Sequence, residues 1–95
     1  MTHYVLLKFK SGSDLDTIEK TIRKTYEELD KTLSFLNNAK VYRCCVERDS
    51  NADIMAKVDL DKKEQLQDYL THPLHIKMMN TFNDVLASRA SFDHE

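Results

Sequence analysis

The chain has one glycine, Gly12, and one proline, Pro73, among its 95 residues. Glycine and proline are the residues that most often mark turns and linkers, so this chain has little room for flexible connections. No segment has the composition of a linker, a repeat or a low-complexity tract. We therefore expect a single unit, residues 1–95, whose helices and strands are joined by short turns.

The charge of the chain is nearly balanced, with 14 Lys and Arg residues against 16 Asp and Glu residues and a formal net charge of −2. No basic cluster is longer than the pair Lys62-Lys63, so the chain offers no electrostatic surface for nucleic acid or anionic lipid. No stretch approaches the roughly 20 apolar residues of a membrane span, and no basic segment precedes the first apolar run. We expect no nucleic-acid or membrane partner and a cytoplasmic location.

The only cysteines, Cys44 and Cys45, are neighbours in the sequence. Neighbouring residues of a strand point to opposite faces, so this pair cannot join distant segments. Unpaired cysteines agree with a reducing compartment, where they commonly act as small apolar residues. We expect both to be reduced and to pack within a strand.

Period-two alternation of apolar residues over positions 3–9 predicts the first strand. The two faces of this strand are both apolar near its start. One face carries His3, Val5, Leu7 and Phe9, and the other carries Tyr4, Leu6, Lys8 and Lys10.

Apolar residues at three- and four-residue steps from Leu15 to Leu36 predict a long amphipathic helix. Asp14 can cap its start, and Asn37-Asn38 fits its end because Asn tolerates the left-handed conformation. Three pairs with the acid four residues before the base support the exposed face, each by about 0.2–0.5 kcal/mol. These pairs are Asp16–Lys20, Glu19–Arg23 and Glu27–Lys31.

The second half of the chain begins with a hairpin, residues 40–48 and 54–60 around a turn at 49–51. Asp61 and Glu64 then resemble a capping box for a second helix, which we expect to end near His72.

Pro73 fits the first turn of a third helix. The apolar stripe of this helix is Met78, Met79, Phe82, Val85 and Leu86. The alternation of residues 89–94 predicts a weak fourth strand.

The order β-α-β-β-α-α-β predicts an α+β, ferredoxin-like fold with a four-stranded antiparallel sheet. The helices of such a fold cover only one face of the sheet, yet the first strand is apolar on both faces. In a chain this small, the simplest cover for the other face is a second copy of the chain. We therefore expect a homodimer formed through the face that bears Tyr4 and Leu6.

Two of the four histidines fall on faces that should be buried. His3 shares the strand face of Val5 and Leu7, and His75 lies on the apolar stripe of the third helix. Tyr69 belongs to the apolar stripe of the second helix and brings a phenol to the same interior. These groups are either core residues with satisfied hydrogen bonds or a set for general acid–base chemistry on a small molecule.

Metal binding is the weaker interpretation of the histidines. His72 and His75 are one helical turn apart, but His72 precedes proline and should leave helical geometry, so it more readily caps the third helix. No cysteine or carboxylate at ligand spacing accompanies them, and we expect no metal. The sequence also lacks a Gly-rich phosphate loop and a nucleophile elbow, so we expect no nucleotide cofactor and no serine-hydrolase chemistry.

Two segments resemble a known family. They are His3-x-x-x-x-x-Phe9-Lys10 and Tyr69-Leu70-x-His72-Pro73-Leu74-His75. On these residues the whole chain resembles a stress-responsive A/B barrel (Dabb) domain, a family that includes plant polyketide cyclases. The resemblance implies a ferredoxin-like protomer whose sheet packs on that of a second copy, which forms a dimeric α/β barrel.

For the cyclase branch, the resemblance implies that His75 is the general base. It would remove the proton between two carbonyls of a poly-β-keto chain, while Tyr69 and His3 hold a carbonyl oxygen as it gains charge. Such a proton is acidic enough for a neutral imidazole, and the enolate needs hydrogen-bond donors. Relatives commonly have a histidine where this chain has Ile54 and an aromatic residue where it has Leu60, so the substrate is not carried over.

Three functions remain open on the sequence. The first is a cytosolic dimer that binds a small apolar or aromatic molecule, with no reaction established. The second is a cofactor-free enzyme of the cyclase or aldol-condensation type, and the third, by fold analogy alone, is a cofactor-independent monooxygenase of the related barrels. In each, we expect His3, Tyr69 and His75 to line one cavity, with the pKa of a buried His75 below the usual value of about 6.5.

Overall fold

A computed structural model describes all residues, 1–95. The elements in chain order are β1 (Thr2–Phe9), α1 (Leu15–Thr32), β2 (Leu36–Arg43), β3 (Ile54–Leu60), the short 3-10 helix η1 (Lys63–Gln65), α2 (Leu66–Leu70), α3 (Pro73–Phe82), the 3-10 helix η2 (Asn83–Val85) and β4 (Leu86–His94). The predicted order and the ferredoxin-like α+β class are confirmed. None of the helices combines the length and the hydropathy that crossing a bilayer requires.

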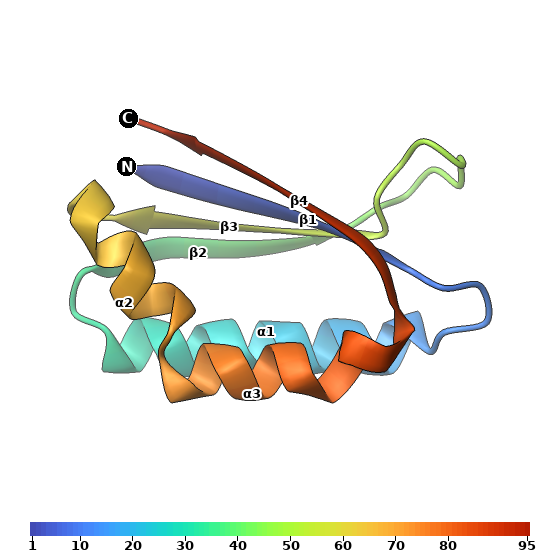
Figure 1. The fold of residues 1–95 in the computed structure, drawn as a ribbon, viewed down its shortest axis with the longest axis horizontal. Helices are drawn as coiled ribbons and strands as arrows, with labels where there is room; N and C mark the ends of the chain where they lie inside the picture. Colours follow the sequence, from blue (N-terminus) through green and yellow to red (C-terminus); the bar gives the residue numbers. More distant parts are fainter.

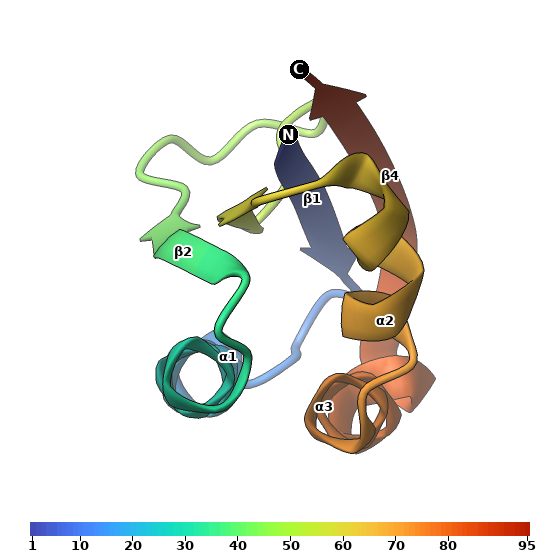
Figure 2. The same ribbon diagram turned by 90° about the vertical axis from the view of Figure 1, so that its left-hand side faces the viewer.

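The four strands form one antiparallel sheet in the order β2-β3-β1-β4. All the helices lie on the same side of this sheet, with α1 and α3 running side by side beneath it (Figure 1). The view along the helices places α1 under the β2 side of the sheet, and α2 and α3 under the side of β1 and β4 (Figure 2). The opposite face of the sheet has no cover within the chain.

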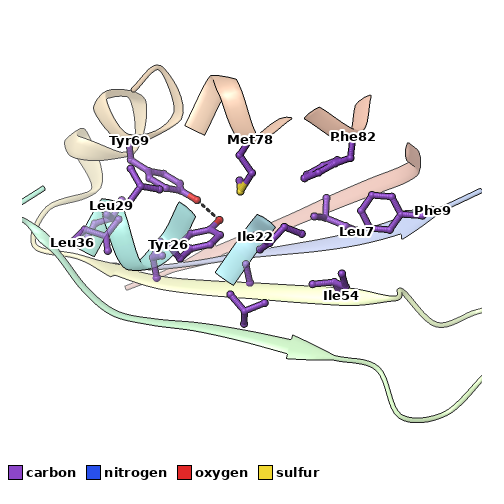
Figure 3. Packing of buried hydrophobic residues seen from close by; sticks show 14 residues of the cluster. Leu7, Phe9, Ile22, Tyr26, Leu29, Leu36, Ile54, Tyr69, Met78 and Phe82 are labelled. Atoms are coloured by element: carbon purple, nitrogen blue, oxygen red, sulfur yellow. Dashed lines mark hydrogen bonds between the residues drawn. The ribbon is translucent and has the colours of Figure 1, made fainter. Parts of the chain in front are cut away.

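The core lies between the sheet and the helices (Figure 3). Phe9 of β1 meets Phe82 of α3 edge to face, with ring centroids 5.3 Å apart. Ile22 and Leu29 of α1 are fully buried against the sheet. A buried aliphatic side chain of this size contributes about 1.5–3 kcal/mol relative to an exposed one, so this layer holds the helices to the sheet.

Of the three predicted ion pairs of α1, the structure contains one. Arg23 Nε lies 2.9 Å from Glu19 Oε2. Asp16 and Glu19 also bind Arg43 at the end of β2, each at 3.0 Å. These two pairs tie the first turns of α1 to β2, in addition to the Glu19–Arg23 pair along the helix.

The predicted end of α1 was wrong. The helix stops at Thr32 because Leu33 takes an extended backbone, with φ −100° and ψ 107°, and Leu36 already pairs with Leu60 in the sheet. Asn38 does adopt the left-handed conformation, with φ 52°, but it does so in β2. It lies where the pairing of β2 with β3 shifts register, between Asn37 and Lys40, and so forms a bulge rather than a helix cap.

The expectation that Cys44 and Cys45 pack within a strand was also wrong. The strand β2 ends at Arg43, and both cysteines are exposed and unpaired in the loop that leads to β3. This loop extends beyond the end of the sheet (Figure 1). It is tied back by Lys8, whose ammonium group donates to the carbonyl oxygens of Asp49 and Asn51.

The capping of α2 and α3 is confirmed at one helix and corrected at the other. His72 has an extended backbone and its Nδ1 accepts from the Leu74 amide at 3.1 Å, so it caps α3 as expected. In the capping box before α2, Gln65 takes the place expected for Glu64, because its side chain accepts from the Lys62 amide at 2.8 Å.

The last strand is longer than expected. The strand β4 begins at Leu86, because its pairing with β1 extends to Phe9, and α3 ends at Phe82. Val85 and Leu86 therefore belong to η2 and β4 and not to the stripe of α3.

Candidate functional site

Pairing of β1 with β4 brings three polar residues to the helix-facing side of the sheet. Residues directly opposite each other in an antiparallel pair share a face. Leu7 is buried against the helices, so its whole row, and the polar residues of β4 opposite it, face the same way. The pairs are His3 with Asp93, Val5 with Ser91 and Leu7 with Arg89.

His3 is held by the first of these partners. Only 5% of His3 is exposed, and its Nδ1 lies 2.5 Å from Oδ1 of Asp93. A carboxylate that accepts the Nδ1–H fixes the orientation of the imidazole and leaves Nε2 available to another molecule. Asp93 itself remains partly exposed, so the pair spans the boundary between the interior and solvent.

Tyr69 lies between the two buried histidines. Its ring centroid is 5.8 Å from that of His3 and 4.9 Å from that of His75, both at edge-on angles. Its hydroxyl is 2.5 Å from the hydroxyl of Tyr26 on α1, the contact drawn in Figure 3. Burial raises the pKa of Tyr26 to about 12 and the pKa of Tyr69 well above its usual value, so both phenols are neutral at pH 7.

His75 lies on α3 with 9% of its surface exposed. Burial lowers its pKa, because a low-dielectric environment disfavours the imidazolium. Hydrogen bonding to the Leu70 backbone opposes this effect, and the positive charges of His3 and Arg89 add to it. The predicted direction is confirmed, and His75 is neutral at pH 7.

A cavity of about 180 Å³ opens between the sheet and the helices, and nine of its fourteen lining residues are hydrophobic. The lining residues are His3, Val5, Leu7, Ile22, Tyr26, Ala56, Leu66, Leu70, His75, Met78, Met79, Arg89, Ser91 and Asp93. Two of the three predicted site residues, His3 and His75, therefore line one cavity. Tyr69 is not among the lining residues, because its ring packs behind the histidines and its hydroxyl is taken up by Tyr26.

The tyrosine that lines the cavity is Tyr26, which the sequence did not single out. The signal was present, since Tyr26 is four residues after Ile22 and three before Leu29 on the buried stripe of α1. Asp93 and Arg89 were missed for a different reason. Their inward position depends on the register of β4 against β1, which no local pattern defines.

Ile54 and Leu60, the two positions where this chain departs from the expected family pattern, are ordinary core positions. Ile54 is 1% exposed and Leu60 is 2% exposed. Neither is among the residues that line the cavity. The polar groups of the cavity thus come from β1, β4, α1 and α3 only.

The outer face of the sheet is a second feature of note. Tyr4 stacks on His94 with centroids 5.6 Å apart and lies 6.3 Å from Phe92. Phe92 is 62% exposed and Tyr42 is 50% exposed, both on this face. We call this apolar surface of Tyr4, Leu6, Tyr42, Met55 and Phe92 the outer sheet face.

Comparison with known families and structures gives a consistent result. The family described as Stress responsive A/B Barrel Domain (Dabb) matches residues 1–95. Comparison with curated proteins gives no match.

Three solved structures illustrate the likeness in fold. A dimeric protein of unknown function and ferredoxin-like fold from Bacteroides fragilis has 21% identity and a TM-score of 0.84, over 99% of this chain and 93% of its own. A dimeric ferredoxin-like protein from Thermobifida fusca has 22% identity and a TM-score of 0.78, over 96% of this chain and 85% of its own. A hydroxynitrile lyase from Passiflora edulis has 12% identity and a TM-score of 0.76, over 98% of this chain and 89% of its own.

Proposed function

Because this chain belongs to the stress-responsive A/B barrel family, we propose that it is a homodimer that binds a small apolar or aromatic molecule in the cavity of each protomer. The observation that supports binding is the cavity itself. It is lined mainly by apolar side chains, while the polar groups of His3, Tyr26 and His75 converge on it from three elements. Small-molecule sites typically combine an apolar lining with a few placed polar groups.

The volume of the cavity limits the size of the molecule that it can bind. Apolar cavities of about 150 Å³ take up benzene, so about 180 Å³ suits a single aromatic ring or a short branched chain. A polycyclic molecule would need the cavity to open further. We therefore propose a monocyclic or similarly small molecule.

The homodimer is supported by the outer sheet face, which no element of the chain covers. Exposed apolar area of this kind marks an interaction surface, and a second copy offers the same surface in return. The Bacteroides fragilis and Thermobifida fusca proteins, which share the fold, are described as dimeric. Two exposed cysteines that stay unpaired also agree with the cytoplasm.

Benzene added to isotope-labelled protein tests the binding proposal. The methyl resonances of Met78 and Met79, which line the cavity, should shift in a saturable way. The variant Ser91→Phe, which fills the mouth of the cavity from β4, should abolish the shifts, whereas Ser34→Phe, at an exposed turn, should leave them intact. Shifts that are absent in the unmodified protein, or that survive Ser91→Phe, would contradict the proposal.

A second candidate function is cofactor-free proton abstraction, which one specific observation favours. His75 is buried, neutral at pH 7 and at the cavity wall, as a general base for a carbon acid should be. The Passiflora edulis lyase shares the fold, so the architecture can hold an active site.

In this second candidate, three groups have distinct roles. His75 removes a proton that lies between two carbonyls. The imidazole of His3, oriented by its contact with Asp93, holds the enolate oxygen, and Tyr69 acts as a positioning residue that packs against both rings. Tyr26, which also lines the cavity, bonds to the Tyr69 hydroxyl and so fixes the position of that ring.

Hydrogen–deuterium exchange of benzoylacetone in D₂O tests this candidate. The protein should raise the exchange rate at the central carbon above that in buffer. The variant His75→Gln should lose the acceleration while still binding benzene, and His94→Gln, on the outer sheet face, should retain it. Equal rates with and without protein would remove this candidate and leave the binding proposal in place.

A further inference from the structure

Arg89 is unusual among the cations of this protein, because it lies on the inner face of the sheet without a carboxylate partner. Arg23 and Arg43 both form ion pairs on the surface. Asp93 is the one carboxylate that lines the cavity with Arg89, and it is bound to His3. The guanidinium of Arg89 is thus an unneutralised positive charge at a cavity wall.

Arg89 lies at the opening of the cavity to solvent. It is opposite Leu7, so its side chain starts on the helix-facing side, but β4 is the edge strand and Arg89 stays exposed. Deeper in the cavity the lining is apolar, with Ile22 and Met78 contributed by the helices. A molecule whose ring enters this cavity therefore has its other end near a guanidinium.

We infer that the bound molecule is a small aromatic or aliphatic carboxylate, with its apolar body in the cavity and its carboxylate on Arg89. This inference rests on the proposed binding function and adds the charge of the ligand to it.

A carboxylate is the anion that fits this arrangement. The planar guanidinium offers two parallel N–H donors that match a carboxylate, and such bidentate pairs are among the stronger hydrogen bonds in proteins. The cavity lining contains no lysine and no second arginine, so a doubly charged phosphate would remain half neutralised. The volume of about 180 Å³ is of the size that holds one ring, which makes benzoate a suitable probe.

The charge of Arg89 also reaches His75, whose pKa it lowers. A carboxylate bound to Arg89 would offset that charge and raise the pKa of His75. The other groups that face His75 are His3, with its partner Asp93, and the neutral phenol of Tyr69. The titration of His75 is therefore a readout of the carboxylate that does not depend on affinity.

The test compares benzoate with benzamide, its neutral analogue of nearly the same shape, at pH 7 and low salt. Benzoate should bind about tenfold or more tightly than benzamide, in line with a charge-assisted hydrogen bond. Arg89→Gln should remove this preference, so that the variant binds benzoate no more tightly than benzamide, and Arg89→Lys should retain part of it. Arg48→Gln, at an exposed loop position, is the matched control and should change neither affinity.

Histidine ring resonances complete the test, since benzoate should raise the midpoint of His75 in the unmodified protein and not in Arg89→Gln. Equal affinities for benzoate and benzamide, or a preference that survives Arg89→Gln, would overturn this inference while leaving the cavity as a binding site. Failure of benzoate, benzamide and benzene alike to shift the cavity resonances would overturn the proposed function and this inference with it.

Discussion

His75 is an ionisable ring on the apolar face of a helix, and its burial makes the stability of the protein depend on pH. Burial lowers its pKa, so the folded protein binds a proton there less readily than the unfolded chain, whose histidine titrates near 6.5. The contribution of the neutral ring to stability is fully present above that value. It is lost as the pH falls from about 6.5 through the folded-state pKa.

The first prediction is that His75→Gln makes the protein less sensitive to mild acid. Between pH 7.5 and pH 5, the free energy of unfolding of the unmodified protein should fall by more than that of the variant, because only the former must protonate His75. Urea unfolding at a series of pH values measures both, and all the other titratable groups are the same in the two proteins. Parallel pH profiles would show that His75 is not buried as described.

A second prediction concerns the two buried phenols. Tyr26→Phe strands the hydroxyl of Tyr69, which has no other partner, and should cost about 1–3 kcal/mol. Tyr69→Phe should cost less, because the hydroxyl of Tyr26 faces the cavity and can find water there. The double variant should cost about 1 kcal/mol less than the sum of the two, as expected for directly coupled groups.

Chemical denaturation of the four proteins gives this coupling, with Tyr42→Phe as the control. Tyr42 is half exposed, so removing its hydroxyl should change the free energy of unfolding by less than about 0.5 kcal/mol. Strict additivity of the two buried substitutions would contradict the hydrogen bond.

The sequence predicted the burial of a side chain where the periodicity of its own helix or strand defines which way it points. His3 follows from strand alternation and His75 from helix periodicity, and both are buried at the cavity. The direction of the Tyr69 hydroxyl was not predictable, since it depends on Tyr26 of another helix. Asp93 and Arg89 required the register between the two ends of the chain.

Among the elements, helices and strands were predictable in kind but not at their ends. Leu33 and Leu36 fit the helical stripe of α1, yet Leu36 gains a strand partner, Leu60, that lies 24 residues away. The same long-range pairing extends β4 back to Leu86. Local periodicity contains no information on such long-range pairing. The ends of helices and strands that are joined by short turns are therefore the least predictable part of the fold.

A third prediction tests the bulge of β2. At Asn38, where φ is 52°, glycine should give a more stable protein than alanine by about 1–2 kcal/mol, because only glycine adopts the left-handed region without cost. At Lys40, an exposed strand residue of ordinary conformation, alanine should be the more stable of the two. Thermal unfolding of the two pairs of variants measures this. The same order at both positions would mean that Asn38 has no left-handed backbone.

For the whole molecule, the two faces of the sheet differ, because the helices cover one face and no element of the chain covers the other (Figure 1). The strand β4 illustrates this, since its polar residues face the cavity and Phe92 faces outward. This reverses the usual arrangement, in which the inner face is the apolar one. It agrees with the proposed ligand site on the inner side of β4 and the proposed second copy on its outer side.

A fourth prediction follows for assembly. Phe92→Glu places a charge on the outer sheet face and should weaken the homodimer at least about tenfold, as loss of a buried aromatic at an interface commonly does. Ile76→Glu, an equally apolar and exposed position on α3, should not affect it. Sedimentation velocity across a concentration series distinguishes the two. A monomeric unmodified protein, or equal effects of both variants, would contradict the dimer.

The central claim is that the space beside His75 takes up a small apolar ring. A crystal structure of the protein soaked with benzene tests it most directly. We expect the ring in the cavity of each protomer, in contact with Met78 and Met79 and next to the imidazole of His75. A cavity that holds only ordered water, with benzene absent or bound elsewhere, would contradict the claim.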